Sequence, residues 1–357
     1  MWTINLPYME KTLTIIIPTY NMEQYLDRCL KSLVFDDPLF HAVEILIIND
    51  GSKDRSSEIG HYYESMYSGV FRTIDKKNGN YGSCINVGLR ETRGKYVKIL
   101  DADDYFDTGI FPHFVEFLSS TEADCVISDM RQVRPDGSVI ERYNFNLPID
   151  GSVFELSALG DAADSMWMHC VCYRTEILRK ISYNQSEGIS YTDQDWIFLP
   201  MAFASHIAYY PNVVYNYLVG RDGQTINSQV WCRNFWQEIE GVEVMLRERE
   251  QYKTQCSEYA IKYMDIRLVH RIKTIYYAFF LLFDNLDNND RMSELDILVC
   301  EYDKQLYDNL EKSIVMFKFF HYVKSWRKSN RTNTSLMKII RHMFRKKNKD
   351  VDCFFIR

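Results

Sequence analysis

The sequence predicts an α/β domain over residues 1–228 and an all-α region over residues 229–357. In the first part, short apolar runs rich in β-branched residues alternate with segments of helical spacing. Continuously apolar strands of this kind are typical of a mixed, mainly parallel sheet covered by helices on both faces. After about residue 229 the chain becomes poor in Gly and Pro and keeps helical spacing, which favours helices alone.

The first half supplies four predicted strands and the helices between them. The strand runs are residues 12–17, 43–48, 70–74 and 96–100, and the helical segments are residues 23–34, about 55–67, and 82–92. Each helix connects one strand to the next, as the crossover of a parallel sheet requires.

The second half of this domain is less regular. A strand is expected at residues 124–128, and residues 134–138 form a predicted hairpin turn with Gly137 at its tight position. Helical or mixed structure is expected at 161–179 and a helix at 193–204. Two short strands, residues 207–210 and 213–218, are predicted around Pro211.

Composition narrows the class of protein. The 357 residues can bury a large core, and the net charge of −7 disfavours a general nucleic-acid binder. Nine cysteines without a CxxC pair indicate reduced thiols rather than zinc or a disulfide framework.

The first ten residues lack a secretory pattern, and the apolar run 275–283 is too short to span a bilayer, so we expect a cytoplasmic protein.

Three carboxylates, Asp101, Asp103 and Asp104, directly follow the predicted strand 96–100. Burying an unpaired carboxylate is costly, so such a cluster needs a cation or hydrogen-bond donors. In open α/β sheets ligands lie at the carboxyl ends of strands, and Mg²⁺ is held by carboxylates together with substrate phosphates. The cluster therefore predicts a metal–diphosphate site; a helix cap would need only one of the three.

Three further loops follow strands that should end at the same edge. They are residues 18–21, 49–54 and 77–83. The first could form a base-stacking wall, the second ends in an acid that could accept a base N–H, and the third is Gly-rich and opens a helix whose N-terminus favours anions. Each alone is compatible with an ordinary turn and helix cap. Together they favour a nucleotide-binding site.

The motifs also match a known family. In order they are Ile16-Ile17-Pro18-Thr19-Tyr20-Asn21, Ile48-Asn49-Asp50-Gly51-Ser52-Lys53-Asp54, Asn78-Gly79, Gly94-Lys95-Tyr96 and Asp101-Ala102-Asp103-Asp104. This series resembles glycosyltransferase family 2 over about residues 12–225. The resemblance implies a GT-A type fold and an inverting enzyme that uses a nucleotide-sugar donor.

The resemblance implies a role for each donor-site residue. Pro18, Thr19 and Tyr20 would frame the nucleoside base. Asp50 would bind that base, which the family leads us to expect is uracil, with Asn78 beside it. In the carboxylate cluster, Asp101 would face the ribose or sugar, Asp103 would hold Mg²⁺ or Mn²⁺, and Asp104 would support them. Many relatives carry an Arg where this chain has Ile85.

An inverting transfer also needs a general base for the acceptor hydroxyl. Relatives place it in a Glu-Asp pair before an aromatic residue, and alignment on Trp196 assigns the base to Asp193, with Thr192 where Glu is usual. Asp195 is the competing candidate, and a helix N-cap is the alternative role for Asp193. Arg221 lies where relatives close a loop over the diphosphate, so it would either clamp phosphate oxygens or be a solvated loop residue. His169 would line the acceptor side or serve the core.

The end of the chain carries a basic amphipathic segment. Residues 318–349 contain nine or more Lys and Arg and no acid before Asp350, with apolar residues Leu336, Ile339, Ile340, Met343 and Phe344 at helical spacing. Such a helix fits an anionic membrane on the inner face of the cell, a polyanionic acceptor, or packing on the protein itself. A homo-oligomer is compatible with the aromatic-rich helices before it.

We therefore predict an inverting glycosyltransferase of cell-surface polysaccharide synthesis. It would move a sugar from UDP to a hydroxyl of a glycan or lipid-linked acceptor. One alternative is a non-catalytic sugar-nucleotide-binding or scaffold protein. The other is a nucleotidyltransferase, which would be expected to carry a basic Gly-rich signature near its N-terminus that this chain lacks.

Overall fold

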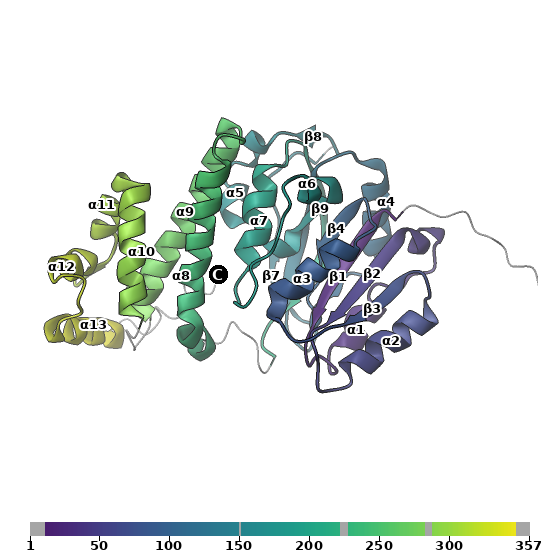
Figure 1. Cartoon of the computed structure of the whole chain (residues 1–357), viewed down its shortest axis with the longest axis horizontal. Helices are drawn as coiled ribbons and strands as arrows, with labels where there is room; N and C mark the ends of the chain where they lie inside the picture. Colours follow the sequence, from purple (N-terminus) through teal and green to yellow (C-terminus); the bar gives the residue numbers. More distant parts are fainter. Residues whose placement is uncertain (1–10, 150, 222–227, 283–287, 348–357) are drawn as a thin grey trace, which may run out of the picture. The chain divides into compact units, whose positions relative to one another are not determined.

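A computed structural model describes residues 11–149, 151–221, 228–282 and 288–347 (Figure 1). The chain divides into two compact units. The first unit comprises Met1–Asp222 together with Cys256–Tyr263, and the second comprises Gly223–Gln255 together with Met264–Arg357.

The first unit is built on one mixed sheet with the strand order β3-β2-β1-β4-β9-β6-β10-β5. β7 pairs with β6 and β8 pairs with β10. The strands are β1 (Leu13–Thr19), β2 (Val43–Asn49), β3 (Phe71–Asp75), β4 (Tyr96–Ile99), β5 (Tyr105–Phe106), β6 (Cys125–Val133), β7 (Val139–Tyr143), β8 (Val153–Phe154), β9 (Val171–Arg174) and β10 (Ile207–Leu218).

The first four of these strands form the parallel part of the sheet that the sequence predicts. β1 pairs in parallel with both β2 and β4, and β2 pairs in parallel with β3. Every residue of β1 and β2 is buried, which requires cover on both faces. β9 then joins β4 and β6 in antiparallel pairing and brings the second half of the domain onto the same sheet.

Helices and short 3₁₀ turns connect these strands. α2 packs on β3, α3 packs on β1 and β2, and α4 packs on β10. The helical elements are α1 (Leu26–Lys31), η1 (Pro38–Ala42), α2 (Ser56–Met66), α3 (Asn80–Glu91), α4 (Phe111–Ser120), η2 (Leu156–Leu159), α5 (Ala162–Ser165), η3 (Met168–Cys170), α6 (Thr175–Lys180) and α7 (Asp193–Ala202).

The segment 161–179 is mixed, in agreement with the sequence, with strand β9 lying between the short helices η3 and α6. Two features of this unit differ from the sequence expectations. The two strands expected around Pro211 are one strand, β10, whose register with β6 shifts between Tyr210 and Tyr215. Helix α4 was not predicted. The turn at 134–138 is confirmed, with Gly137 at φ 84° and β7 following it.

The second unit is helical, as predicted, with one small addition. Its elements are α8 (Ser228–Tyr252), α9 (Glu258–Tyr277, which begins in the first unit), the π-helical turn η4 (Ala278–Leu282), α10 (Asn289–Tyr302), α11 (Lys304–Ser313), β11 (Val315–Met316), β12 (Phe320–His321), α12 (Tyr322–Lys328) and α13 (Ser335–Lys347). The hairpin β11–β12 was not expected. Phe280 lies at the centre of an aromatic core, against Phe279, Tyr322 and Trp326. Within the described residues, no helix combines the length and the apolar character that crossing a bilayer needs.

A pH-sensitive contact joins α2 to the edge of the sheet. The imidazole Nε2 of His61 lies 2.8 Å from Asp75 Oδ2, and Nδ1 lies 2.9 Å from Glu64 Oε2. The hydrogen bond to Asp75, followed by that to Glu64, raises the pKa of His61 above its usual 6.5, against the opposing effect of partial burial.

His61→Gln should therefore reduce stability only at low pH. Protonated His61 is favoured in the folded state, so its contribution is complete below about pH 6.5 and is lost as the pH rises through the raised pKa. Urea unfolding of wild type and variant should differ at pH 5.5 and converge at pH 8.5. His113→Gln, at an exposed histidine of α4, is the matched control. A difference that grows with pH would contradict this assignment.

Candidate active site

The loops that follow four parallel strands meet at one edge of the sheet. Thr19 of β1 is paired with Asn49 of β2, and Asn49 with Asp75 of β3, so these strands end side by side. β4 runs parallel to β1 and ends immediately before the carboxylate cluster. The predicted convergence of the four loops at the carboxyl edge is therefore present in the structure.

The first two loops are tied to each other. The backbone N–H of Asp50 donates to the Thr19 carbonyl at 2.8 Å, and the Lys53 N–H donates to Asn21 Oδ1 at 2.8 Å. Pro18 and Thr19 lie within buried β1, and the Thr19 hydroxyl turns inward to the Ile17 carbonyl. The Tyr20 ring is 45% exposed, so it is the member of the predicted base-binding trio that a ligand can reach.

Asp50 organises the start of α3. Its buried carboxylate pairs with Lys76 and accepts hydrogen bonds from the N–H groups of Gly79, at 2.9 Å, and Asn80, at 3.0 Å. Asn78 Nδ2 donates to the Asp50 carbonyl at 3.0 Å. The structure thus brings the predicted pair Asp50 and Asn78 together, and it gives the Asp50 carboxylate the helix-capping contacts that were the alternative to base binding.

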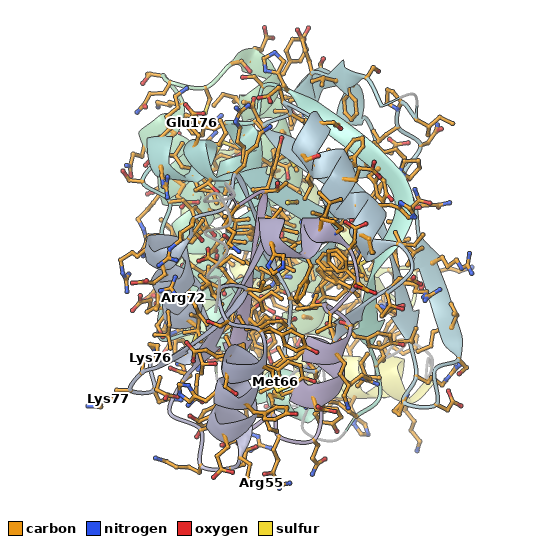
Figure 2. The ribbon with its side chains drawn as sticks, turned by 90° about the vertical axis from the view of Figure 1, so that its right-hand side faces the viewer. Arg55, Met66, Arg72, Lys76, Lys77 and Glu176 are labelled. Atoms are coloured by element: carbon orange, nitrogen blue, oxygen red, sulfur yellow. The ribbon has the colours of Figure 1, made fainter. Side chains whose placement is uncertain are left out.

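Lys76 was not singled out in the sequence, although it completes this arrangement. Its ammonium group also donates to the Lys77 carbonyl and to Ser83 Oγ, at 2.9 and 2.8 Å. Lys76 and the exposed Lys77 lie next to each other just before α3 (Figure 2). A lysine at a helix N-terminus favours an anion there, and this is the edge where a diphosphate is expected.

Asp104 is the most deeply buried member of the carboxylate cluster. It is fully buried and accepts hydrogen bonds from the Tyr215 hydroxyl and the Leu218 N–H, both at 2.7 Å. Burial, and then the neighbouring charges of Asp103 and Asp101, raise the pKa of Asp104 well above its usual value. Because both donors belong to β10, Asp104 joins that strand to the end of β4, which is the supporting role that the sequence assigned to it.

Asp103 faces a different partner. Its carboxylate forms an ion pair with the guanidinium of Arg221, which also lies 5.2 Å from the centre of the Tyr25 ring. Burial raises the pKa of Asp103, the Asp101 charge adds to this effect, and Arg221 opposes both. Arg28 donates to the Asp103 carbonyl at 2.8 Å. The predicted metal ligand and the predicted phosphate clamp are therefore in direct contact.

Asp101 lies between a tyrosine and a histidine. The Tyr81 hydroxyl donates to Asp101 Oδ1 at 2.6 Å, and His169 Nε2 lies 3.4 Å from Asp101 Oδ2. His169 is buried, and within the described residues its Nδ1 has no hydrogen-bond partner. Asp101 remains 23% exposed at its side chain, so it is the most accessible carboxylate of the cluster.

The cluster fits a hard divalent cation. Asp101, Asp104 and His169 each offer one ligand atom, and these atoms all lie within 4.8 Å of one another. Mg²⁺ and Mn²⁺ accept carboxylate and, for Mn²⁺, imidazole ligands. Asp103, the ligand predicted from the sequence, is a third carboxylate of the cluster but is not a member of this group, and its carboxylate is paired with Arg221.

Aromatic rings extend from His169 along one side of the cluster. The His169 ring centre lies 4.8 Å from that of Tyr217 and 6.2 Å from that of Trp167, which in turn lies 5.3 Å from Tyr143. Trp167, Tyr217 and Tyr143 are partly exposed. We call these three residues the aromatic wall. His169 therefore lies between the aromatic wall and Asp101, and its burial is also compatible with the core role that the sequence left open.

Asp193 begins helix α7 near the same cluster. Its side chain is exposed, and its charge contributes to the raised pKa values of both Tyr81 and Tyr217. Asp195 is buried, and its Oδ2 accepts a hydrogen bond from the Ser186 N–H at 3.0 Å. Of the two competing aspartates, Asp193 is the one available to a substrate.

The segment before α7 is anchored to α3. Asn86 Nδ2 donates to the Gln185 carbonyl and to Glu187 Oε1, and its Oδ1 accepts from the Gln185 N–H at 2.8 Å. A Cβ atom on Gly82 would lie only 1.9 Å from the Ser186 carbonyl oxygen. Helix α3 therefore positions the segment that leads to Asp193. Asn86, the residue after Ile85, has a structural role in this contact.

The mixed sheet and its flanking helices have the arrangement of the GT-A type. The chain matches the profile described as "Glycosyl transferase family 2" over residues 14–182, a little under half of its length.

Curated relatives carry related names. An "Uncharacterized glycosyltransferase MG025 homolog" of Mycoplasma pneumoniae is 37% identical over 125 residues, 33% of this chain and 42% of the relative. Poly(ribitol-phosphate) beta-N-acetylglucosaminyltransferase TarS of Staphylococcus aureus is 24% identical over 217 residues, 60% of this chain and 37% of that protein. The matches thus span less than half the length of these relatives.

A solved structure confirms the fold. The crystal structure of S. aureus TarS 1-349 in complex with UDP-GlcNAc superposes with a TM-score of 0.67 at 17% identity, covering 94% of this chain and 92% of that chain. The agreement extends over the α/β domain and a helical C-terminal region, as the sequence predicts.

Gly82→Ala should destabilise the first unit. The added methyl group meets the backbone of Ser186, and overpacking of this kind costs about 1–3 kcal/mol. Thermal unfolding should show a midpoint several degrees lower. Gly109→Ala is the matched control, because its Cβ would make an ordinary contact of 3.5 Å with Asp107. Equal midpoints for the two variants would show that α3 and residues 185–187 are not in close contact.

Proposed function

We propose that this protein is an inverting glycosyltransferase that moves a sugar from a nucleoside diphosphate, UDP being the expected nucleotide, to a hydroxyl of a glycan or lipid-linked acceptor. The observation that carries the proposal is the joint position of the carboxylate cluster and the exposed Asp193. Tyr81 is a neighbour of both: its hydroxyl donates a hydrogen bond to Asp101, and the charge of Asp193 contributes to its raised pKa. An inverting transfer needs a leaving-group site and a base close together in this way.

The nucleoside would lie over the first two loops. Tyr20 offers an exposed ring at the end of β1, next to Pro18 and Thr19. Asp50 Oδ2 accepts a hydrogen bond from the Asn80 N–H at 3.0 Å, and a carboxylate oxygen can accept a second from a base N–H. Asn78 is exposed beside it. Lys76 and the start of α3 would face the phosphates.

The diphosphate would lie against Asp103 and Arg221. We propose that Asp103 is a ligand of Mg²⁺ or Mn²⁺, with Asp101 towards the sugar. A bound divalent cation stabilises negative charge on the departing diphosphate as a Lewis acid. Arg221, which is paired with Asp103, would offer its guanidinium to the phosphate oxygens, which bind arginine in a fork geometry.

The base would act on the other side of the sugar. We assign to Asp193 the removal of the acceptor hydroxyl proton while the acceptor oxygen forms its bond to the anomeric carbon. The bond from that carbon to the diphosphate breaks on the opposite face, so the configuration inverts. The aromatic wall of Trp167, Tyr217 and Tyr143 would support an acceptor sugar ring beside this base.

The names of two relatives suggest which acceptor class to test. One of them is the "Minor teichoic acid biosynthesis protein GgaB" of Bacillus subtilis, 32% identical over 104 residues, which are 29% of this chain and 12% of that protein. Together with TarS, it makes a cell-surface polysaccharide or polyol-phosphate polymer the acceptor class to test first.

UDP should stabilise the protein only when a divalent cation is present. Thermal-shift measurements with UDP and UDP-sugars should show a higher midpoint with Mn²⁺ than with EDTA. Asp103→Asn should abolish this difference, whereas His169→Ala should keep it if Asp103 is the principal ligand. Asp136→Asn, at the tip of the exposed 134–138 turn, is the control for surface charge. A shift that survives in Asp103→Asn and is lost in His169→Ala would favour the His169 ligand set.

Asp193→Asn should abolish transfer without weakening donor binding. Loss of a general base lowers the rate by about 10²–10⁴-fold. The transfer rate is measured as UDP released from the donor in the presence of acceptor polymer. UDP titration measures donor-site binding. Gln194→Ala provides a neighbouring control at the same helix terminus. Undiminished transfer in Asp193→Asn would exclude this residue as the base, and loss of UDP binding would indicate a structural role.

A further inference from the structure

The second unit presents exposed apolar side chains on one side of α13. Leu336, Ile339 and Met343 are 63%, 57% and 56% exposed, and their spacing of three and four residues places them on one helix face. The opposite side of α13 is turned inward, with Met337 and Arg341 only 2% and 4% exposed. The helix is therefore packed by one face while a second apolar face points away from the core.

The β11–β12 hairpin contacts α13 and carries a further exposed apolar residue. The Phe317 ring packs edge-on against Phe344 of α13, with the ring centres 5.6 Å apart. Two residues later, at the turn, Phe319 is 73% exposed, the most exposed large apolar residue of the described chain. We call Phe319, Leu336, Ile339 and Met343 the apolar face.

Lysines accompany the apolar face. From residue 312 to residue 347 the sequence contains no Asp or Glu. Among the residues described from 318 onward, five lysines are exposed and form no ion pair with a carboxylate of the described residues: Lys318, Lys324, Lys328, Lys338 and Lys346.

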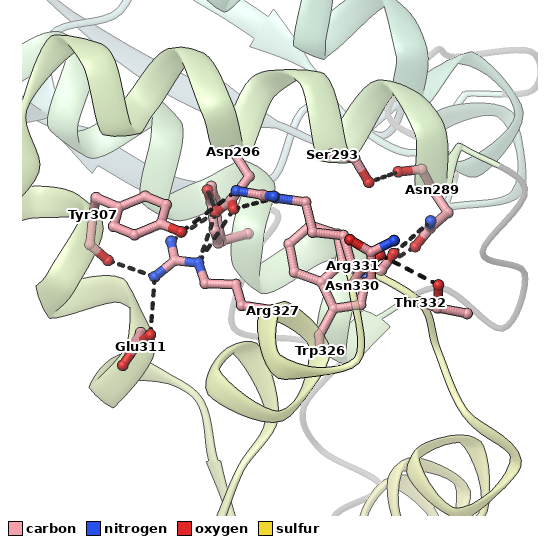
Figure 3. A network of polar contacts seen from close by, with 11 residues as sticks. Asn289, Ser293, Asp296, Tyr307, Glu311, Trp326, Arg327, Asn330, Arg331 and Thr332 are labelled. Carbon is pink, nitrogen blue, oxygen red and sulfur yellow. Dashed lines mark hydrogen bonds and ion pairs between the residues drawn. The ribbon is translucent and has the colours of Figure 1, made fainter.

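Arg327 and Arg331, in the same region, form ion pairs within the protein. Arg327 and Arg331 both bind the fully buried carboxylate of Asp296 on α10, at 2.7 and 2.8 Å (Figure 3). Trp326 adds a hydrogen bond from its indole N–H to Asn289 Oδ1 at 3.0 Å. These contacts fix α12, which carries Lys324 and Lys328, to α10, and they pair Arg327 and Arg331 with a carboxylate.

We propose that the apolar face and its five lysines form a docking surface for an anionic lipid bilayer. Apolar side chains at helical spacing with basic neighbours are the features by which a helix lies in the membrane interface. The lysines would contact lipid phosphates, and the four apolar side chains would enter the acyl boundary. A soluble polyanion would use the lysines but would leave the apolar face in water, so the exposed phenylalanine and aliphatic residues favour lipid. This inference does not depend on the proposed transferase activity.

Flotation with vesicles tests the proposal on the full chain. Wild-type protein should float with vesicles of phosphatidylcholine and phosphatidylglycerol at 7:3, and at least tenfold less with phosphatidylcholine alone. Raising the salt concentration should weaken binding. The triple variant Leu336→Gln, Ile339→Gln, Met343→Gln should lose binding at least tenfold. Lys338→Gln with Lys346→Gln should weaken it by about fivefold for each lysine.

Matched variants control for general effects on the surface. Ile297→Gln with Leu298→Gln removes two exposed apolar residues of α10, and Lys262→Gln with Lys273→Gln removes two exposed lysines of α9. Both controls should bind vesicles as the wild type does. Unchanged thermal midpoints will show that every variant is folded, because all substituted residues are exposed.

Three outcomes would overturn the proposal. They are equal flotation with neutral and anionic vesicles, full binding by the triple apolar variant, and an equal loss in the α9 and α10 controls. Binding of inorganic polyphosphate distinguishes a soluble polyanion from a membrane as the ligand of the lysines. If it binds wild type and the triple apolar variant equally while neither floats with vesicles, the lysines serve a polyanionic acceptor and the membrane assignment is wrong.

Discussion

The clustering of three carboxylates at one sheet edge, two of them buried and one partly exposed, is the constraint on which the first unit depends. Each carboxylate is compensated by a different part of the chain: Asp104 by β10, Asp103 by Arg221 beyond β10, and Asp101 by Tyr81 of α3. A buried carboxylate without such donors would cost several kcal/mol. The cluster thus requires β10 and α3 to meet at the end of β4, and this meeting creates the proposed site.

A second buried carboxylate applies the same principle to the neighbouring loops. Asp50 compensates the positive charge of Lys76 and caps the first N–H groups of α3. Through α3, Asn86 then holds residues 185–187, which lead to Asp193. The donor loops and the proposed base are therefore positioned by one helix, so a change in α3 is expected to affect both parts of the reaction.

Local pattern was sufficient to predict the parallel strands, their loops and the carboxylate cluster, because apolar runs and turn residues report on structure within a few positions. It could not identify Lys76, Tyr81 and Tyr215, whose roles arise from pairing between distant segments. The same limit explains why β9 was missed at 161–179, where short helices surround four strand residues. In the second unit, helical spacing revealed apolar residues on α13, but only packing separates buried Met337 from exposed Ile339.

The most direct test of the account is a crystal structure with UDP and Mn²⁺, using anomalous scattering to locate the metal. We predict a manganese peak at bonding distance from the Asp103 carboxylate, with UDP phosphates on the same ion, the base beside Tyr20, and Arg221 turned from Asp103 to the phosphates. A peak held by Asp101 and His169 without Asp103 would contradict the ligand assignment. UDP bound away from this sheet edge would contradict the proposed donor site itself.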